Sequence, residues 1–327
     1  MALPKLYPII LSPTVKNYIW GGQKLLNLVG ADKATDQKPV AEIWAVHGKN
    51  YIKNGFYSGY TLNQLLNERP KDLMGLSQSW NQGDEFPILI KILDCQQWLS
   101  IQVHPDNLLA KKLEGPQHSG KTETWYFLDS EPGSQIYAGT KTDVTQTALT
   151  DAIESHKIQD VLQMHEIKKD DFILIEAGVI HALGPGLVVY ELQQNSDLTY
   201  RVYDWDRPMN AGRPLHIEKS CLAAKNLQTT PRNLQPKVKG NSFLPLIQSP
   251  FFKLEIINNM DGFINFDTAF MTFQILTVSS GEMILQTDDQ AFSIKQYETI
   301  LLPAGLGKYK LSGDFSVLRA SPCICES

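Results

Sequence analysis

The stretch Asp170-Asp-Phe-Ile-Leu-Ile-Glu-Ala-Gly-Val-Ile-His181 combines a polar turn, a short apolar run and a glycine turn that ends at a histidine. An apolar run bounded by turn residues is typical of a buried β-strand. The same plan recurs in Tyr297-Glu-Thr-Ile-Leu-Leu-Pro-Ala-Gly-Leu-Gly-Lys308. Lys308 replaces His181 there, and a lysine ammonium is a poor zinc ligand at neutral pH. If the similarity is not chance, one β scaffold occurs twice and only the first copy keeps a metal-binding histidine.

The rest of the chain is also mainly β in pattern. Short apolar runs separated by Gly, Pro and Asn lie at residues 41–46, 88–93, 124–128, 172–176, 188–192, 252–257, 271–278, 282–286 and 299–302. Helical periodicity is confined to residues 61–67, 107–114 and 144–163, the last with a break near His156. We therefore expect a mostly β protein with helices as insertions or caps. Residues 226–240 are polar and contain two prolines, which favours a linker before a compact all-β unit.

Length and charge limit the class of protein. The 327 residues suggest two domains, and the net charge of −5 argues against nucleic acid as a partner. Neither a membrane-spanning apolar segment nor a signal-peptide core is found in the sequence. We expect a cytoplasmic protein with no membrane partner.

Four potential metal ligands occur at predicted strand ends. In Leu99-Ser-Ile-Gln-Val-His-Pro-Asp106, Gln102 and His104 are two residues apart, so their side chains face the same side of a strand. Glu123 precedes an aromatic strand, where a buried carboxylate needs a partner. With His181 these residues form a set that suits Zn²⁺ with one open position. The alternatives are an ordinary strand-edge pair for Gln102 and His104, and an exposed ion pair of Glu123 with Lys121.

Residues 190–207 are dense in polar and aromatic side chains, as a sugar-binding site requires. Arg201 or Arg207 could bind a phosphate with two hydrogen bonds, and Lys91 and Lys121 add positive charge. The alternative is a surface cluster of ion pairs formed by Asp197 and its acidic neighbours with the arginines.

Several motifs together resemble type I mannose-6-phosphate isomerases. They are Trp20-Gly-Gly, Ala41-Glu-Ile-Trp44, Pro87-Ile-Leu-Ile-Lys-Ile-Leu93, Leu99-Ser-Ile-Gln-Val-His-Pro105, Lys121-x-Glu123, Gly178-x-x-His181 and Gln194-Asn-Ser-Asp-x-x-x-Arg201. Each motif is weak alone, but the ordered set is specific. Longer members carry a histidine just before the Lys-x-Glu motif, where this chain has Gly120, so this chain is similar to the compact bacterial members.

The resemblance implies two cupin-type β-barrels of the jelly-roll kind. Residues 1–236 would form the zinc-binding domain, with a helical insertion at about 141–165, and residues 237–327 a degenerate, metal-free domain. One zinc ion per chain would be held by His104, Glu123 and His181, with Gln102 the least secure ligand. The active-site arginine would be Arg201.

The implied reaction is the reversible conversion of D-mannose 6-phosphate to D-fructose 6-phosphate through an enediol or enediolate. Lys121, Glu191 and Asp197 are the candidate bases, while Lys91, Lys121 and Arg201 would bind substrate. Arg201 would either bind the phosphate or stabilise the enediolate. An Fe(II) cupin oxygenase and a non-catalytic sugar-phosphate sensor are the alternatives, and the protein would be a monomer or a homodimer.

Overall fold

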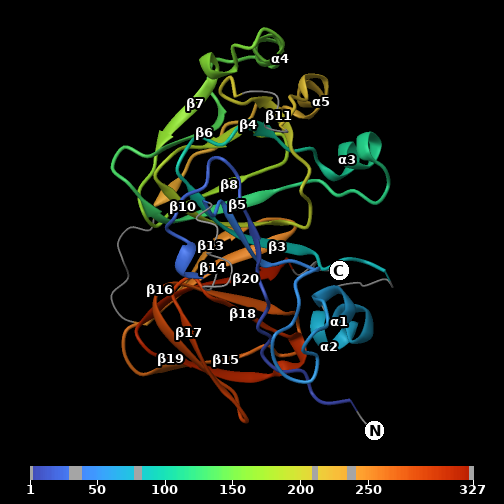
Figure 1. Cartoon of the computed structure of the whole chain (residues 1–327), viewed down its shortest axis with the longest axis vertical. Coiled ribbons are helices and arrows are strands. Elements are labelled where there is room, and N and C mark those ends of the chain that lie inside the picture. The colour runs from blue at the N-terminus through green and yellow to red at the C-terminus, as the bar shows by residue number, and fades with distance from the viewer. Residues whose placement is uncertain (1–2, 29–38, 77–82, 208–212, 234–240, 324–327) are drawn as a thin grey trace. The chain divides into compact units, whose positions relative to one another are not determined.

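The computed structural model describes residues 3–28, 39–76, 83–207, 213–233 and 241–323 (Figure 1). The chain divides into two compact units. The central unit comprises residues 15–43 and 91–234, and the C-terminal unit comprises residues 1–14, 44–90 and 235–327. Both units are mostly β, as predicted.

Two sheets contain the strands of the central unit. The seven-stranded sheet has the order β1 (Thr14–Lys16), β2 (Glu42–Val46), β3 (Ile88–Cys95), β10 (Leu187–Gln194), β5 (Glu123–Ser130), β8 (Asp171–Ile175) and β12 (Arg232–Asn233). The five-stranded sheet has the order β11 (Tyr200–Tyr203), β4 (Ile101–Val103), β9 (His181–Leu183), β6 (Gln135–Thr140) and β7 (Leu162–Glu166).

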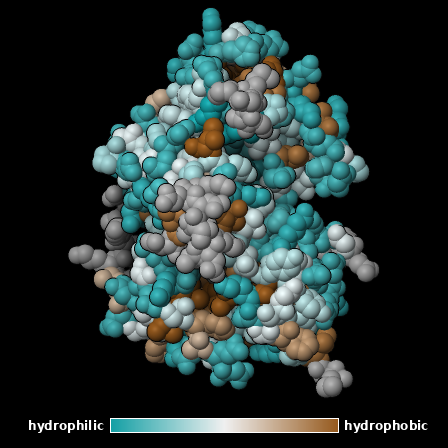
Figure 2. Space-filling view, in the orientation of Figure 1, coloured by the Kyte–Doolittle hydropathy of each residue, from teal (hydrophilic) through white to brown (hydrophobic). Residues whose placement is uncertain are grey.

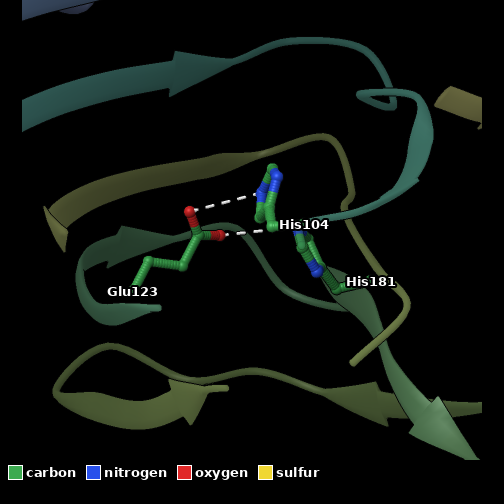
Figure 3. Close-up of side chains that lie close together, drawn as sticks. All are labelled: His104, Glu123 and His181. Atoms are coloured by element: carbon green, nitrogen blue, oxygen red, sulfur yellow. Dashed lines mark ion pairs between the residues drawn. The ribbon is translucent and has the colours of Figure 1, made fainter. Parts of the chain in front are cut away.

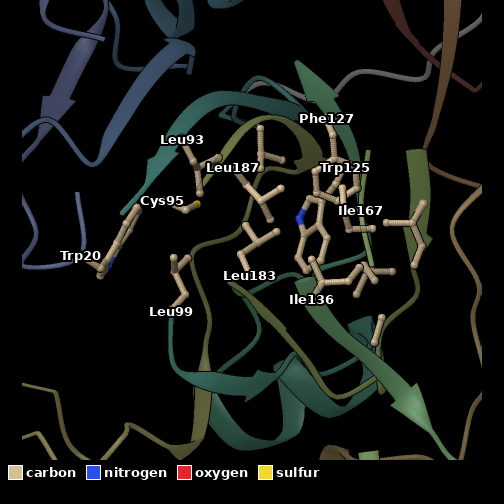
Figure 4. Packing of buried hydrophobic residues seen from close by; sticks show 14 of the residues in the cluster. Trp20, Leu93, Cys95, Leu99, Trp125, Phe127, Ile136, Ile167, Leu183 and Leu187 are labelled. Atoms are coloured by element: carbon tan, nitrogen blue, oxygen red, sulfur yellow. The ribbon is translucent and has the colours of Figure 1, made fainter. Parts of the chain in front are cut away.

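The core of the central unit lies between these two sheets. Trp125 and Phe127 of β5 and Leu187 of β10 pack with Ile136 of β6 and Leu183 of β9, all at most 1% exposed (Figure 4). Every residue of β3 and β10 is buried. Burial on both faces explains why these strands appear in the sequence as continuous apolar runs rather than alternating ones.

Helices cover the other face of the five-stranded sheet. Leu149 and Ile153 of α4 (Gln146–Glu154) and Ala223 of α5 (Ile217–Ala223) pack against Ile101 of β4 and Val202 of β11. Further helical segments in the described part of the central unit are α3 (Asn107–Glu114), η1 (Leu26–Leu28) and η2 (Ile158–Asp160).

The predicted helix over residues 144–163 is only partly correct. The chain leaves α4 and adopts a φ of +58° at His156, which confirms the break. Residues from Leu162 onward form β7, because they pair with β6, a partner more than 20 residues away that the local pattern does not show.

In the C-terminal unit an eight-stranded sheet forms most of the structure. Its main path is β13 (Ser242–Gln248), β14 (Phe252–Asn259), β20 (Phe315–Pro322), β16 (Gln274–Gln286), β19 (Lys308–Ser312) and β15 (Phe263–Asp267). The strands β17 (Ala291–Lys295) and β18 (Thr299–Leu302) also pair with β16. The unit further contains α1 (Leu62–Glu68), α2 (Pro70–Met74) and η4 (Ala304–Leu306).

The N-terminal residues belong to this C-terminal unit. Ile9 and Leu301 exchange backbone hydrogen bonds of 2.7 and 2.9 Å. The division therefore groups residues 1–14 and 44–90 with the C-terminal strands, whereas the sequence placed them with the zinc-binding domain. The boundary between the zinc-binding and the metal-free domain, expected between residues 236 and 237, stays a prediction. Of the expected linker at 226–240, residues 232–233 form β12, and residues 234–240 lie outside the described part of the chain.

Both copies of the repeated segment consist of a strand, a turn and a second strand. In the first copy β8 precedes His181, which opens β9 and is buried. In the second, β18 precedes Lys308, which opens β19 and is exposed. The two residues therefore hold matching positions in the strand order but differ in burial.

Hydrophilic side chains cover most of the face drawn in Figure 2, where hydrophobic ones form small separate patches. None of the helices in the described ranges has both the length and the apolar character needed to cross a membrane.

Candidate metal centre

Three buried side chains that can bind a metal lie close together inside the central unit, namely His104, Glu123 and His181. His104 follows β4 and His181 opens β9, whereas Glu123 opens β5 of the other sheet. Their potential ligand atoms all lie within 4.8 Å of one another. Figure 3 shows the three side chains converging, with the carboxylate facing both imidazoles. The fold thus brings together three residues that are far apart in the sequence.

Hydrogen bonds to the backbone orient both imidazole rings. His104 Nδ1 lies 2.7 Å from the carbonyl oxygen of Leu198. His181 Nδ1 lies 2.9 Å from that of Val179. A carbonyl oxygen only accepts hydrogen bonds, so Nδ1 carries the proton and Nε2 of each neutral ring is an acceptor. These Nε2 atoms lie 3.5 and 3.4 Å from the two oxygens of Glu123. Metal-binding histidines are typically held in this way.

Burial keeps both rings neutral. It lowers the pKa of His104 well below its usual range, and the nearby Lys121 cation lowers it further. Burial also lowers the pKa of His181 to about 4. The pKa of Glu123 is raised by burial and by the negative charge of Glu191, against the opposing effect of Lys121. Among the described residues, no hydrogen-bond donor reaches Glu123 Oε1. Buried acceptors without donors are costly, and a bound cation would remove that cost.

The ammonium group of Lys121 supplies a positive charge at these acceptors. Its Nζ lies 2.7 Å from Glu123 Oε2 and 3.2 Å from His104 Nε2. The Lys121 and Glu123 side chains are 4% and 0% exposed, so the alternative of an exposed ion pair is wrong. Two imidazole nitrogens and a carboxylate match the three protein ligands of a catalytic zinc site, and they also suit Fe(II).

Gln102, the predicted fourth ligand, lies beside His181 in the sheet. Its Nε2 is 3.3 Å from His181 Nε2, and its Oε1 accepts a hydrogen bond of 3.3 Å from the Ser100 hydroxyl. A half-turn of the amide would present Oε1 to the cluster and let Nε2 donate to the hydroxyl. The role of Gln102 as a ligand stays a prediction.

A buried network of opposite charges adjoins the cluster. Lys91 Nζ lies 2.9 Å from Glu191 Oε1 and 3.9 Å from Glu42 Oε2. Trp125 Nε1 donates to Glu191 Oε2 at 3.1 Å, and Lys121 Nζ lies 3.9 Å from Glu191 Oε1. Burial alone would raise the pKa of Glu191, but the two lysines lower it. The network therefore connects Lys91, Glu191 and Lys121, three of the predicted site residues.

Arg201 of β11 is linked to His181 of the cluster by strand pairing in the five-stranded sheet. It pairs with Gln102, which in turn pairs with His181. Directly opposite residues of antiparallel strands project to the same face, so Arg201 points to the side of the sheet that carries His181. Asp197 is exposed, and no hydrogen bond or ion pair within the described ranges joins its carboxylate to the cluster.

The chain is similar to known proteins over almost its whole length. Residues 9–160 match the model of the phosphomannose isomerase type I catalytic domain, and residues 247–322 match that of the mannose-6-phosphate isomerase cupin domain. The mannose-6-phosphate isomerase of Streptococcus mutans is 32% identical, and the alignment covers 97% of this chain and 99% of that protein. The chain belongs to the type I phosphomannose isomerase family.

Further relatives support the family assignment. Mannose-6-phosphate isomerase ManA of Bacillus subtilis is 32% identical over 94% of this chain and 96% of its own length. The crystal structure of the B. subtilis mannose 6-phosphate isomerase superimposes with a TM-score of 0.83 at 30% identity, covering 96% of this chain and 99% of that one. These matches confirm the resemblance and the cupin-type fold predicted from the motifs.

Close packing explains one departure from the longer family members. A Cβ atom at Gly120 would lie 2.5 Å from the backbone nitrogen of Asn107. The Gly120 N–H also donates to Asn107 Oδ1 at 2.8 Å, and the Lys121 N–H donates to the Pro105 carbonyl at 3.0 Å. A histidine does not fit at this position of the turn.

Two charged residues at the site were not among the predicted ones. Glu42 could have been predicted from the sequence, because a carboxylate in the apolar run 41–46 needs a buried partner. Arg213 lies beside Arg201, and its surroundings in the sequence show no periodic pattern. Its position depends on tertiary contacts alone.

Proposed function

We propose that the chain interconverts D-mannose 6-phosphate and D-fructose 6-phosphate with one zinc ion per chain. Two observations taken together support this proposal. Relatives named for this activity align with almost the whole chain, and that chain contains a buried His-Glu-His cluster whose nitrogen and oxygen acceptors suit a metal. A sugar phosphate is the implied partner. The monomeric or dimeric state and the cytoplasmic location stay predictions.

The ligands in this proposal are His104, Glu123 and His181, with Gln102 as the fourth candidate. Zinc bound there would act as a Lewis acid, lowering the free energy of the negative charge that develops on the sugar oxygens. The fold contributes orientation, because backbone carbonyls fix both imidazole rings.

Lys121 is our candidate for moving the proton between C2 and C1: its neutral amine would take the proton from C2, and the ammonium so formed would return it to C1. The aldose loses a proton from C2, C1 gains one, and a hydroxyl proton passes from O2 to O1, so no atom is gained or lost. Of the three candidate bases, Lys121 alone lies within 3.2 Å of predicted metal ligands in the described structure. Glu191 is held by Lys91 and Trp125, which suits a positioning role. Asp197 is exposed, unlike Lys121 and Glu191.

Arg201 supplies a cation on the face of the sheet that carries the cluster. Its Nε donates to Ser100 Oγ at 3.2 Å and its Nη1 to the Pro214 carbonyl at 3.1 Å. These two hydrogen bonds hold the Arg201 guanidinium in one orientation. A guanidinium group held in this way can bind phosphate through charge-assisted hydrogen bonds. We assign Arg201 to substrate binding. Lys91, which pairs with Glu191 at 2.9 Å, suits a positioning role, and its direct contact with substrate stays a prediction.

A coupled assay of fructose 6-phosphate formation tests the proposal. We expect activity in the purified protein, its loss after chelation and its return with zinc. Oxygen consumption without isomerisation would instead identify an Fe(II) oxygenase. Tight binding of mannose 6-phosphate without turnover by the zinc-loaded protein would identify a sensor, and either result would refute the proposal.

A further inference from the structure

Two arginines of the central unit share one hydroxyl group. Ser100 Oγ accepts a hydrogen bond of 3.2 Å from Arg201 Nε and one of 3.0 Å from Arg213 Nη2. Two guanidinium groups at one acceptor repel each other. Within the described ranges, Arg201 has no carboxylate at ion-pair distance, and Arg213 Nε lies 3.4 Å from Asp204 Oδ2. The pair therefore carries more positive charge than its neighbours neutralise.

The Arg213 side chain is held in place but not fully hydrogen-bonded. Its Nη1 is buried and has no hydrogen-bond partner in the described part of the chain. Asp204, which orients Arg213, also pairs with Arg207 at 2.9 Å. Arg207 in turn donates to the Trp98 carbonyl at 2.7 Å. These contacts fix the Arg213 side chain, so Nη1 cannot easily turn toward another acceptor. A buried N–H without an acceptor in this setting indicates that a ligand supplies one.

The arginine pair lies at a suitable distance from the metal cluster. Arg201 and His181 are on β11 and β9, with Gln102 of β4 between them. Neighbouring strands are about 4.8 Å apart, so Arg201 lies roughly 10 Å across the sheet from His181. This span is comparable with the length of an open-chain hexose from its C1–C2 end to a phosphate on C6.

We propose that Arg213 is a phosphate-binding residue that acts with Arg201 as a two-guanidinium clamp for the phosphate monoester dianion of the substrate. A dianion between the two groups removes their mutual repulsion and gives Arg213 Nη1 its acceptor. Arg213 then sets the preference for a phosphorylated sugar over the free sugar. The identity of the sugar rests on the proposed function, whereas recognition of the dianion does not.

Partial burial supports this assignment. Desolvation lowers the pKa of both guanidinium groups from its usual value, which shows that water solvates them poorly. An anion therefore gains more from contact with them than it would at a fully solvated arginine.

Titration of the metal-loaded protein with inorganic phosphate, followed by calorimetry, tests the clamp. We expect Arg213→Gln to weaken phosphate binding about 10- to 100-fold, the range for hydrogen bonds to charged groups. KM for mannose 6-phosphate should rise by a similar factor, with kcat and metal content close to those of the wild type. The matched control is Arg232→Gln, which removes an exposed arginine of the same unit and should change neither value.

Arg213→Lys keeps a cation at the position but loses the planar fork, so it should bind phosphate with intermediate affinity. Circular dichroism checks that Arg213→Lys is folded. This variant therefore still tests the clamp if Arg213→Gln does not fold. Unchanged phosphate affinity in both variants would overturn the assignment. So would an unchanged ratio of kcat/KM between mannose 6-phosphate and mannose, even with lowered stability, because that pattern marks a purely structural arginine. If the wild type lacked isomerase activity, the proposed function would fail, but the phosphate titration would still decide the role of Arg213.

Discussion

Replacing Lys91 by Met should destabilise the central unit strongly. Lys91 and Glu191 are 6% and 4% exposed, and their charged atoms lie 2.9 Å apart. The variant removes the cation and leaves Glu191 and Glu42 buried, with Lys121 as the next cation, 3.9 Å from Glu191. Breaking a buried pair by removing one partner costs about 3–5 kcal/mol, because the remaining charge is uncompensated. We expect a loss of that size in the free energy of unfolding at neutral pH.

Urea unfolding followed by tryptophan fluorescence measures this loss. The matched control is Lys225→Met, because Lys225 forms a lysine–carboxylate pair with Asp106 at 3.1 Å that is 51% and 41% exposed. Such exposed pairs contribute under about 1 kcal/mol. A loss in Lys91→Met no larger than in Lys225→Met would show that the buried network does not stabilise the central unit.

The difference between wild type and Lys91→Met should also depend on pH. The lysines lower the pKa of Glu191 in the folded protein, so its ionisation stabilises the wild type above the unfolded value of about 4.3. That contribution is lost as the pH falls below this value. In the variant Glu191 protonates more readily, and the destabilisation measured at pH 7 should shrink toward pH 4. A constant difference across this range would contradict the electrostatic explanation.

Two further predictions concern the surroundings of the cluster. Gly178 has a φ of +97° and donates its N–H to the His104 carbonyl at 2.9 Å. Gly178→Ala should cost about 1–2 kcal/mol in unfolding free energy and weaken metal binding about 10-fold in a chelator competition; an unchanged metal affinity would show that this turn does not position His104. Cys95 is fully buried, and burial raises its pKa well above the usual value. Mass spectrometry after treatment with a thiol reagent at pH 8 should find Cys95 labelled only after unfolding, in contrast to the partly exposed Cys221, and equal labelling in the native protein would contradict its burial.

Local patterns predicted many of the elements correctly. The helix expected at 107–114 is α3, because Asp106 caps it by accepting a hydrogen bond from the Leu109 N–H. The strand expected at 299–302 is β18. Residues 274–278 of the run 271–278 and all of the run 282–286 instead belong to one strand, β16, which passes through Gly281 with a φ of +76°. A glycine interrupts the apolar pattern in the sequence without ending the strand.

Long-range contacts could not be predicted in the same way. The pairing of Ile9 with Leu301 joins residues almost 300 positions apart, and neither segment carries a local signal for it. For the site, His104, Glu123 and His181 could be found because metal-binding residue types at strand ends are informative in themselves. The role that we propose for Arg213 could not be predicted, since it depends on sharing the Ser100 hydroxyl with Arg201, a tertiary contact.

We propose that His104, Glu123 and His181 together hold one metal ion per chain. Elemental analysis of the purified protein after dialysis tests it directly, with His104→Ala, Glu123→Gln and His181→Ala beside the wild type and His118→Ala as a control outside the cluster. We predict about one zinc per chain in the wild type and the control and a strong loss in each of the three variants. Full zinc content in the three variants, or none in the wild type after growth with zinc, would show that these side chains do not form the zinc site.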